Sequence, residues 1–516
     1  MLKDKLRSPW FWLIAIFLLV GISFRWLNLG SKIFWYDEVF TALRVTGHIG
    51  AEVREQVFTG EPIAAATLLQ YQTFSPDSTL GDTLRSLADH PEHPPLFYLL
   101  CWGWVKIFGS SMAAFRGVSA LASTLTFLAL PWLAWELFLS VEAIVIAPVL
   151  FAFSPVHLLY AQEARQYALW TLLIVLATAA MKRAVRQKRW SVWLIYAVFL
   201  GLMFNTSVLS LFVVMAHGVY ALLINRRQWR TMAVAVGLAG MMFVPWLGVM
   251  WINSQRWQSA TSWTTQVVYP IDALIKLWGL HFSSVFFDPN LPLDHPYSWG
   301  VPPLILVLLI GLSWGIWQSF ARDSSLLLLA LIWVPTACLI GGDWIRDSVL
   351  SKNTRYFMPA LIGFLVAVAG WLSRQYQQRR QWAIVGVATV VGLGLASSIA
   401  IVQAPTWWNK SLGYYNREIA AAISRFEQPV ILIQAHGTTL GDAISLSYYL
   451  PPQTPFVLTV EPEIPQVPNV AKTVLLFQPT EAVFNSFACM PEAIPVPAGL
   501  FQVPCVSSDR RGQNDP

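Results

Sequence analysis

The stretch at residues 90–109 reads HPEHPPLFYLLCWGWVKIFG, and its apolar part is residues 95–109. A helix needs about 20 predominantly apolar residues to cross a bilayer, and this run is shorter than that. The two prolines at its start suit the first turn of a helix, where a missing N–H is tolerated. We therefore expect residues 95–109 to form a juxtamembrane or half-inserted helix, and the placement of every later segment depends on this.

The composition is that of a polytopic membrane protein. Hydrophobic residues make up 56% of the 516 residues, charged residues only 12%, and the mean hydropathy is +0.53. A soluble chain carries about twice this charged fraction. The 26 Trp suit the belts that aromatic rings form at membrane interfaces. The net charge is +6, but long basic runs with interleaved aromatic residues are absent from the sequence, so no nucleic-acid partner is expected.

Apolar runs recur along the whole chain. The first, from Trp10 to about Leu27, follows a basic N-terminus. It lacks a small-residue cleavage motif, so we interpret it as an uncleaved anchor, although a cleaved signal peptide begins similarly. Ten further runs follow residues 95–109, near 112–138, 143–159, 167–181, 191–204, 207–224, 231–250, 301–319, 325–341, 356–373 and 382–403. The pattern predicts an all-α polytopic protein with about eleven transmembrane helices.

The basic residues indicate which loops are cytoplasmic. Three basic clusters separate the apolar runs, at residues 182–189, 226–230 and 374–380. Cytoplasmic loops carry the excess of Lys and Arg. If residues 95–109 do not cross the membrane, all three clusters lie on the same side as the basic N-terminus. If they do cross, the clusters lie on the opposite side. We therefore predict a cytoplasmic N-terminus and a chain whose tail is extracytoplasmic.

Two domains follow from this topology. Residues 1–403 form the transmembrane domain, and residues 28–111 are its first external loop, which contains the juxtamembrane helices. Residues 404–516 form an extracytoplasmic C-terminal domain. This tail is richer in Pro, Gln and charge, and it has short β-like runs at Val430–Gln434 and Thr473–Phe477. The pattern predicts a small α/β domain.

The four cysteines do not have the spacing of a metal site. Cys101 and Cys338 lie in apolar stretches, whereas Cys489 and Cys505 lie in the polar tail. Cys489 and Cys505 are expected to pair if the tail is in an oxidising compartment.

Four polar groups stand beside helix ends on the predicted external face. They are Trp35-Tyr36-Asp37-Glu38, then His90 to Leu96 with Glu92 and His93, then Ser154 to Tyr167 with Glu163 and Arg165, and last Thr354 to Pro359 with Arg355 and Tyr356. Charges near a bilayer are costly, which makes each group a candidate for function. Paired carboxylates with cations nearby suit a base that acts beside an anionic leaving group.

Each group also has a structural explanation. Asp37-Glu38 can solvate a loop, His93 can belong to a simple helix start, Glu163 and Arg165 can be an ion pair at a helix end, and Arg355 can be an interface anchor. None of the groups is specific alone. Their order, their spacing and their common side favour a functional interpretation.

As a set, the four groups resemble the motifs of GT-C glycosyltransferases, specifically the protein O-mannosyltransferases and bacterial aminoarabinose transferases of the glycosyltransferase family 39 kind. The matching pieces are Asp37-Glu38, Glu92 to Leu96, Ser154 to Tyr167, and Arg355 to Pro359. The likeness covers about residues 8–375. It implies a GT-C fold and transfer of a sugar from a polyprenyl-phosphate carrier to an acceptor hydroxyl on the extracytoplasmic face.

The resemblance also implies roles for individual residues. The Asp of the first-loop pair is the base in the family, which is Asp37 here, and Glu38 would orient the acceptor or Asp37. Candidates for binding the donor phosphate or the substrate are His93, Arg116, Glu163, Arg165, Tyr167, Arg355 and Tyr356. A lipid phosphate is a good leaving group, so no strong general acid is needed, unlike in glycoside hydrolysis. Direct displacement predicts inversion at the anomeric carbon.

The chain departs from some members of the family. Aminoarabinose transferases have Lys where His93 stands, whereas mannosyltransferases share the His-Pro-Pro-Leu form. Some members hold a divalent metal near the position of Glu92 and others hold none. Here Glu92 and His281 are candidate metal ligands, although a lone His is more often part of ordinary loop chemistry. Oligosaccharyltransferases carry Asp in the second external loop, where this chain has Glu163 and Arg165, which argues against oligosaccharide transfer.

Two other functions stay open: a polyprenyl-lipid transporter or flippase, and a non-catalytic lipid-binding relative. A transporter typically has charged or broken helices at mid-membrane, whereas the clearest charges here stand at helix ends. A non-catalytic relative is expected to lose the Asp37-Glu38 pair, which is intact. The expected partners are a polyprenyl-phosphate sugar donor, an extracytoplasmic acceptor (protein, lipid or polysaccharide) and membrane lipid. The expected location is the plasma membrane.

Overall fold

The structure is a computed structural model that describes residues 9–224, 228–266, 269–468, 471–497 and 499–505. The N-terminal residues 1–7 and Arg226-Arg227, which contributed to the predicted topology, lie outside the described residues. The chain divides into two compact units. Unit 1 comprises Met1–Gly30, Leu87–Trp104 and Ala113–Ala404, and unit 2 comprises Ser31–Ser86, Val105–Met112 and Pro405–Pro516.

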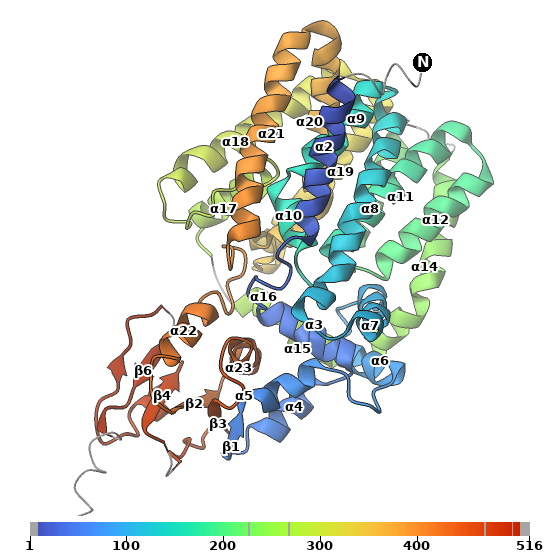
Figure 1. Cartoon of the computed structure of the whole chain (residues 1–516). Helices are drawn as coiled ribbons and strands as arrows, with labels where there is room; N and C mark the ends of the chain where they lie inside the picture. Colours follow the sequence, from blue (N-terminus) through green and yellow to red (C-terminus); the bar gives the residue numbers. More distant parts are fainter. Residues whose placement is uncertain (1–8, 225–227, 267–268, 469–470, 498, 506–516) are drawn as a thin grey trace, which may run out of the picture. The chain divides into compact units, whose positions relative to one another are not determined.

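Unit 1 is built from helices, drawn as ribbons in Figure 1. They are α2 (Pro9–Trp26), α7 (Leu96–Phe108, which ends in unit 2), α8 (Met112–Phe138), α9 (Val141–Ala152), α10 (Pro155–Ala161), α11 (Tyr167–Gln187), α12 (Trp190–Phe204), α13 (Ser210–Ile224), α14 (Trp229–Ile252), α15 (Ser254–Thr261), α16 (Trp263–Gln266), α17 (Ile271–Ser283), α18 (Tyr297–Ser319), α19 (Arg322–Arg346), α20 (Met358–Gln378) and α21 (Arg380–Gln403). Two short 3-10 helices, η2 (Leu350–Lys352) and η3 (Thr354–Phe357), precede α20.

Among the described residues, seven helices are long and apolar enough to cross a membrane: α8, α11, α14, α18, α19, η3 with α20, and α21. The pair α9 and α10 makes an eighth candidate, bent by 62°. The expected polytopic helical fold is confirmed. The total of about eleven spans requires the shorter apolar helices α2, α12 and α13 to cross as well, and that number stays a prediction. Helix α7 is the one expected near residues 95–109, and its 13 residues are too few for a full span.

The break between α9 and α10 is held by a buried arginine from α2. Pro155 begins α10 and cannot donate a backbone hydrogen bond to α9. The guanidinium group of Arg25 donates to the last carbonyls of α9 instead, at 2.7 Å to Phe151 and 2.9 Å to Ala152. Its Nε donates to Ser123 Oγ at 3.0 Å. The end of a helix carries partial negative charge, so this cation stabilises the terminated turn.

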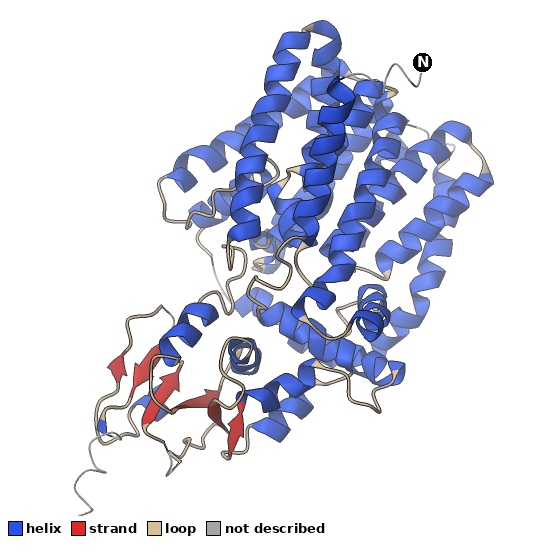
Figure 2. Cartoon of the chain, in the orientation of Figure 1, coloured by secondary structure: helices blue, strands red, loops and turns tan. Residues whose placement is uncertain are grey.

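Unit 2 contains a six-stranded sheet with short helices, and Figure 2 marks its strands in red. Its elements are α3 (Tyr36–Thr46), α4 (Gly50–Val57), β1 (Pro62–Ala64), α5 (Ala65–Leu69), η1 (Gln70–Gln72), α6 (Leu80–Asp89, which ends in unit 1), α22 (Asn416–Ile423), β2 (Pro429–Ala435), α23 (Thr439–Ser447), β3 (Pro455–Val460), β4 (Thr473–Phe477), α24 (Glu481–Phe484), β5 (Glu492–Ala493) and β6 (Leu500–Gln502). Strands β2 and β4 confirm the two β-like runs expected in the tail.

The sheet of unit 2 combines the tail with the first loop. The strand order is β1-β3-β2-β4-β6-β5, in which β2 pairs in parallel with β3 and β4. Strand β2 is buried along almost its whole length, as is typical of a central parallel strand. Strand β1 comes from the first loop and pairs antiparallel with β3, where Ile63 lies opposite Phe456. Cys489 and Cys505, predicted to pair, form a disulfide beside the sheet's core.

Candidate active site

The carboxylate pair lies in the first turn of α3, in unit 2. Acidic residues are favoured at this position, because the N-terminus of a helix carries partial positive charge. The helix ends at Gly47, whose φ of 89° places it in the left-handed region and allows the closing turn. The two carboxylates differ in exposure: Asp37 is half-buried, whereas Glu38 is 0% exposed. Of the pair, Asp37 is therefore the carboxylate that is more exposed to solvent.

The buried carboxylate forms an ion pair with a lysine from the tail. Lys410 Nζ lies 3.5 Å from Glu38 Oε2, and both side chains are almost fully buried. Lys410 stands in the segment that follows α21, where its backbone N–H donates to the Trp407 carbonyl at 2.9 Å. Lys410 is not among the residues that the sequence motifs singled out. Its only signal is an isolated cation next to two Trp, just after the last apolar run.

Helix α23 of the tail packs against the start of α3. A Cβ placed on Gly441 would stand only 2.4 Å from the Tyr36 ring, so this position in α23 requires glycine. Burial and the neighbouring Asp37 charge raise the pKa of Tyr36 to about 12. Burial also raises the pKa of Asp442, in the first turn of α23, to about 6, although Thr438 Oγ1 donates to its carboxylate at 2.9 Å.

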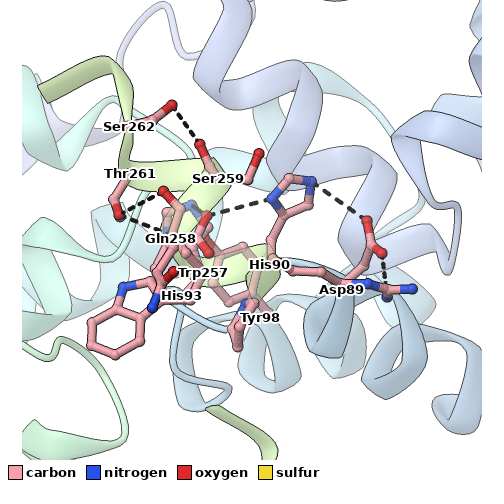
Figure 3. A network of polar contacts seen from close by, with 12 residues as sticks. Asp89, His90, His93, Tyr98, Trp257, Gln258, Ser259, Thr261 and Ser262 are labelled. Carbon is pink, nitrogen blue, oxygen red and sulfur yellow. Dashed lines mark hydrogen bonds and ion pairs between the residues drawn. The ribbon is translucent and has the colours of Figure 1, made fainter. Parts of the chain in front are cut away.

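A second polar group lies in unit 1, where the chain enters α7. His90 stands between two carboxylates: its Nε2 lies 3.7 Å from Asp89 Oδ2, and its Nδ1 lies 3.5 Å from Glu92 Oε1. Figure 3 shows the contact between His90 and Asp89. Arg256 in α15 donates to Asp89 at 2.5 Å, and His93 Nε2 lies 3.6 Å from the shared Glu92 oxygen. Glu92 is thus the centre of two histidine contacts.

Tyr98 in α7 links this group to the third one. Its ring centroid lies 6.0 Å from that of His93, and its hydroxyl lies 3.4 Å from Arg165 Nη1. Ser119 in α8 fixes the backbone here by donating to the Arg165 carbonyl at 3.0 Å. Glu163 and Arg165 are both buried. The segment between α10 and α11 therefore places a cation next to the polar start of α7.

Tyr167, the first residue of α11, links the third group to the fourth. The guanidinium carbon of Arg355 lies 5.9 Å from the Tyr167 ring centroid and 5.5 Å from that of Tyr356. Within unit 1, the structure thus brings together three of the four groups that the sequence singled out. The two rings stabilise the charge of Arg355 through cation–π contacts, which do not require its N–H groups as hydrogen-bond donors.

A second cation, which the sequence analysis missed, stands three residues before Arg355. Lys352 Nζ lies 5.2 Å from the Trp263 ring centroid and 4.9 Å from that of Tyr269. In the described ranges no carboxylate forms an ion pair with it. Burial and the nearby Arg355 charge lower the pKa of Lys352. Two cations held close together are a suitable setting for an anion.

The loop that carries these cations is fixed by Asp343 at the end of α19. Its carboxylate accepts from the backbone N–H groups of Leu350, at 2.8 Å, and Ser351, at 2.7 Å. These bonds satisfy the donors of the η2 turn, which has no helical partner for them.

His281 in α17 makes two hydrogen bonds within the protein. Nε2 donates to the Ser351 carbonyl at 3.1 Å, and Nδ1 accepts from Thr354 Oγ1 at 2.8 Å. Burial lowers the pKa of His281 to about 4, against the effect of the Ser351 carbonyl. Both ring nitrogens are therefore engaged, and the described residues contain no group of three His, Cys, Asp or Glu suited to a metal. A metal at Glu92 and His281 therefore stays a prediction, and we assign no chemical step to one.

The sequence pattern of the Dolichyl-phosphate-mannose-protein mannosyltransferase family matches residues 92–251. This range includes Glu92 to Leu96 of the second polar group and the whole of the third. No curated protein sequence matches the chain.

Solved structures show the same fold. The crystal structure of ArnT from Cupriavidus metallidurans bound to undecaprenyl phosphate aligns at a TM-score of 0.53 and 13% identity, covering 91% of this chain and 93% of that one. The apo form of the same protein aligns at a TM-score of 0.53 and 13% identity over 85% of each chain. This chain therefore has the ArnT-like GT-C fold. The S. cerevisiae Pmt1-Pmt2 complex bound to the sugar donor also aligns, at 15% identity over 57% of this chain and 38% of that one, with a TM-score of only 0.31.

In this GT-C fold, the candidate residues that lie near one another in unit 1 are His93, Arg165, Tyr167, Arg355 and Tyr356. The buried guanidinium group of Arg116 donates to the Leu29 backbone carbonyl, and its place in the phosphate site stays a prediction. Asp37 and Glu38 belong to unit 2. The residues that sequence reasoning missed are Lys352, Lys410, Asp89 and Arg256.

Proposed function

We propose that this chain transfers a sugar from a polyprenyl-phosphate carrier to an acceptor hydroxyl on the extracytoplasmic face. The observation that carries the proposal is the linkage of His93, Arg165 and Arg355 through Tyr98 and Tyr167. Three segments far apart in the sequence deliver cationic or hydrogen-bonding side chains to one part of a GT-C fold. Such a cluster suits a departing phosphate, which needs positive charge and donors.

The reaction is a direct displacement in this proposal. Asp37 takes the proton of the acceptor hydroxyl, and the hydroxyl oxygen attacks the anomeric carbon. The bond from that carbon to the phosphate oxygen breaks, and the electron pair leaves with the lipid phosphate. Arg355, Arg165 and Lys352 hold this anion, with His93 as a further donor. The configuration at the anomeric carbon inverts.

The proposal also includes the orientation in the membrane. The N-terminus is cytoplasmic, the tail is extracytoplasmic, and the helix α7 does not cross. Labelling of single introduced cysteines from outside tests this: reaction near Ser111 with protection near Gln187 supports it, whereas the reverse pattern contradicts it. Both positions lie in the described chain: Ser111 directly precedes α8, and Gln187 is the last residue of α11.

The deciding experiment measures transfer from a labelled polyprenyl-phosphate sugar by the purified protein in lipid. We expect Asp37→Asn to lower the rate about a hundredfold or more, because a positioned base contributes on that order. Asp77→Asn, an exposed carboxylate in the same loop, is the matched control and is expected to keep the wild-type rate. A wild-type protein without transfer for any donor, or an Asp37→Asn variant with more than a tenth of the activity, would count against the proposal.

A lipid transporter is the second candidate, because α9 and α10 form a bent pair in unit 1. The charge at this break, however, is Arg25, whose guanidinium group is bound to backbone carbonyls and Ser123. That arrangement stabilises a helix end and provides no path for a headgroup. Movement of a fluorescent polyprenyl phosphate across liposomes containing Asp37→Asn at the wild-type rate would favour the transporter.

A further inference from the structure

The tail of unit 2 is attached to the segment that carries the carboxylate pair. Three hydrogen bonds join the start of that segment, at residues 31–34, to residues of the tail. The Ile33 N–H donates to the Pro405 carbonyl at 2.7 Å, and the Tyr449 hydroxyl accepts from the Phe34 N–H at 2.7 Å. Arg417 Nη1 donates to the Ser31 carbonyl at 2.7 Å. The tail therefore fixes the backbone immediately before α3.

The tail also reaches the first turn of α3 itself. Gly441 in α23 allows the Tyr36 ring to approach, and Lys410 forms the buried ion pair with Glu38. The other charged groups around Tyr36 are Asp37, Arg44, Arg54 and Asp442. Lys410 and Glu38 carry opposite charges, and both side chains are almost fully buried.

We propose that Lys410 is a positioning residue for the transfer reaction: it holds Glu38 inside unit 2 and thereby fixes the first turn of α3, which also carries Asp37. Glu38 is then not a group that meets the substrate. This inference rests on the proposed function of Asp37 as the base. It also gives the tail a role, because the tail supports the carboxylate helix.

The physical reason is the cost of an uncompensated buried charge. Removal of Lys410 takes away the cation that faces Glu38 and raises the cost of a charged Glu38 side chain inside unit 2, which disturbs the turn that carries Asp37. If both partners become neutral and similar in size, no charge is left uncompensated and the turn keeps its shape. The two residues should therefore act as a unit in a double-mutant cycle.

The test uses the full-length protein in lipid and measures kcat and the donor KM. We expect Lys410→Met to lower kcat at least tenfold with less than a threefold change in donor KM. Lys410→Arg should recover most of the lost kcat. The double variant Glu38→Gln with Lys410→Met should be more active than Lys410→Met alone. Lys472→Met is the matched control, since it removes an exposed ion pair with Glu427 in the same unit, and it should leave kcat unchanged.

A second measurement does not depend on activity. Amide hydrogen exchange should be at least tenfold faster in α3 of Lys410→Met than in the wild type, with exchange in β2 and β4 unchanged. A wild-type protein without transfer would contradict the proposed function, and this exchange difference would still test the pairing. Unchanged kcat and unchanged exchange in Lys410→Met, or strictly additive losses in the double variant, would overturn the inference.

Discussion

Replacing Asp442 with Asn should make unit 2 more stable at neutral pH than the wild-type unit. Asp442 is 2% exposed, in the first turn of α23, and its Oδ1 has no hydrogen-bond partner among the described residues. Burial raises its pKa from 3.8 to about 6, so ionisation at neutral pH opposes folding. An Asn side chain has the same size and can still accept from Thr438 Oγ1, but it carries no charge.

The size of the effect follows from the two pKa values. In the unfolded chain the carboxyl group loses its proton near pH 3.8, whereas in the folded chain it keeps the proton until about pH 6. The native state binds more protons between these values, so stability is fully present below the lower pKa and falls as the pH rises through the higher one. A separation of about two units corresponds to roughly 3 kcal/mol, of which about 2 kcal/mol is lost between about pH 4.5 and pH 7.5.

Hydrogen exchange in β2 and β4 measures this loss, after correction for the intrinsic exchange rates at each pH. We expect the ionisation of Asp442 to lower the free energy of opening of the wild type by about 2 kcal/mol over that pH interval. In Asp442→Asn this contribution to the pH dependence should be absent. Glu481→Gln, an exposed carboxylate in the same unit, serves as the control. The same pH dependence in Asp442→Asn and in the wild type would refute the reasoning.

Two further predictions concern unit 1. Arg355→Ala should weaken binding of the lipid-phosphate donor at least tenfold and acceptor binding much less, as measured from the two KM values, and equal effects on both would reject its phosphate role. Arg25→Lys should lower the thermal unfolding temperature in detergent, because one ammonium group cannot replace the hydrogen bonds to Phe151, Ala152 and Ser123. An unchanged unfolding temperature would show that the α9 end is held by other contacts.

The features that the sequence predicted well are local ones. The short apolar run after His93 predicts α7, because its length alone excludes a full span. The β-rich runs at 430–434 and 473–477 predict β2 and β4, because buried parallel strands are continuously apolar. The motif residues of unit 1 are close together because each stands at the end of a helix, and the bundle gathers such ends.

The features that the sequence could not predict are long-range pairings. Strand β1 has only three residues, with a proline at its start, and it forms a strand because β3 offers an open edge. Lys410 lies 372 positions after Glu38 in a segment without a periodic pattern, and only the folded unit brings the two together. Lys352 lies in a turn whose shape depends on Asp343, which no local rule connects to phosphate binding.

The contacts of a buried cation separate a structural role from a functional one. Arg25 donates to the backbone carbonyl groups at the end of α9, so its positive charge completes the fold. Lys352 instead lies over two aromatic rings, which stabilise its charge but accept few of its hydrogen bonds. A cation held in this way keeps donors for a ligand, and the neighbouring Arg355 makes a ligand of negative charge the favourable one. By this criterion the turn between α19 and α20, rather than the surroundings of Arg25, is the place in unit 1 where a phosphate should bind.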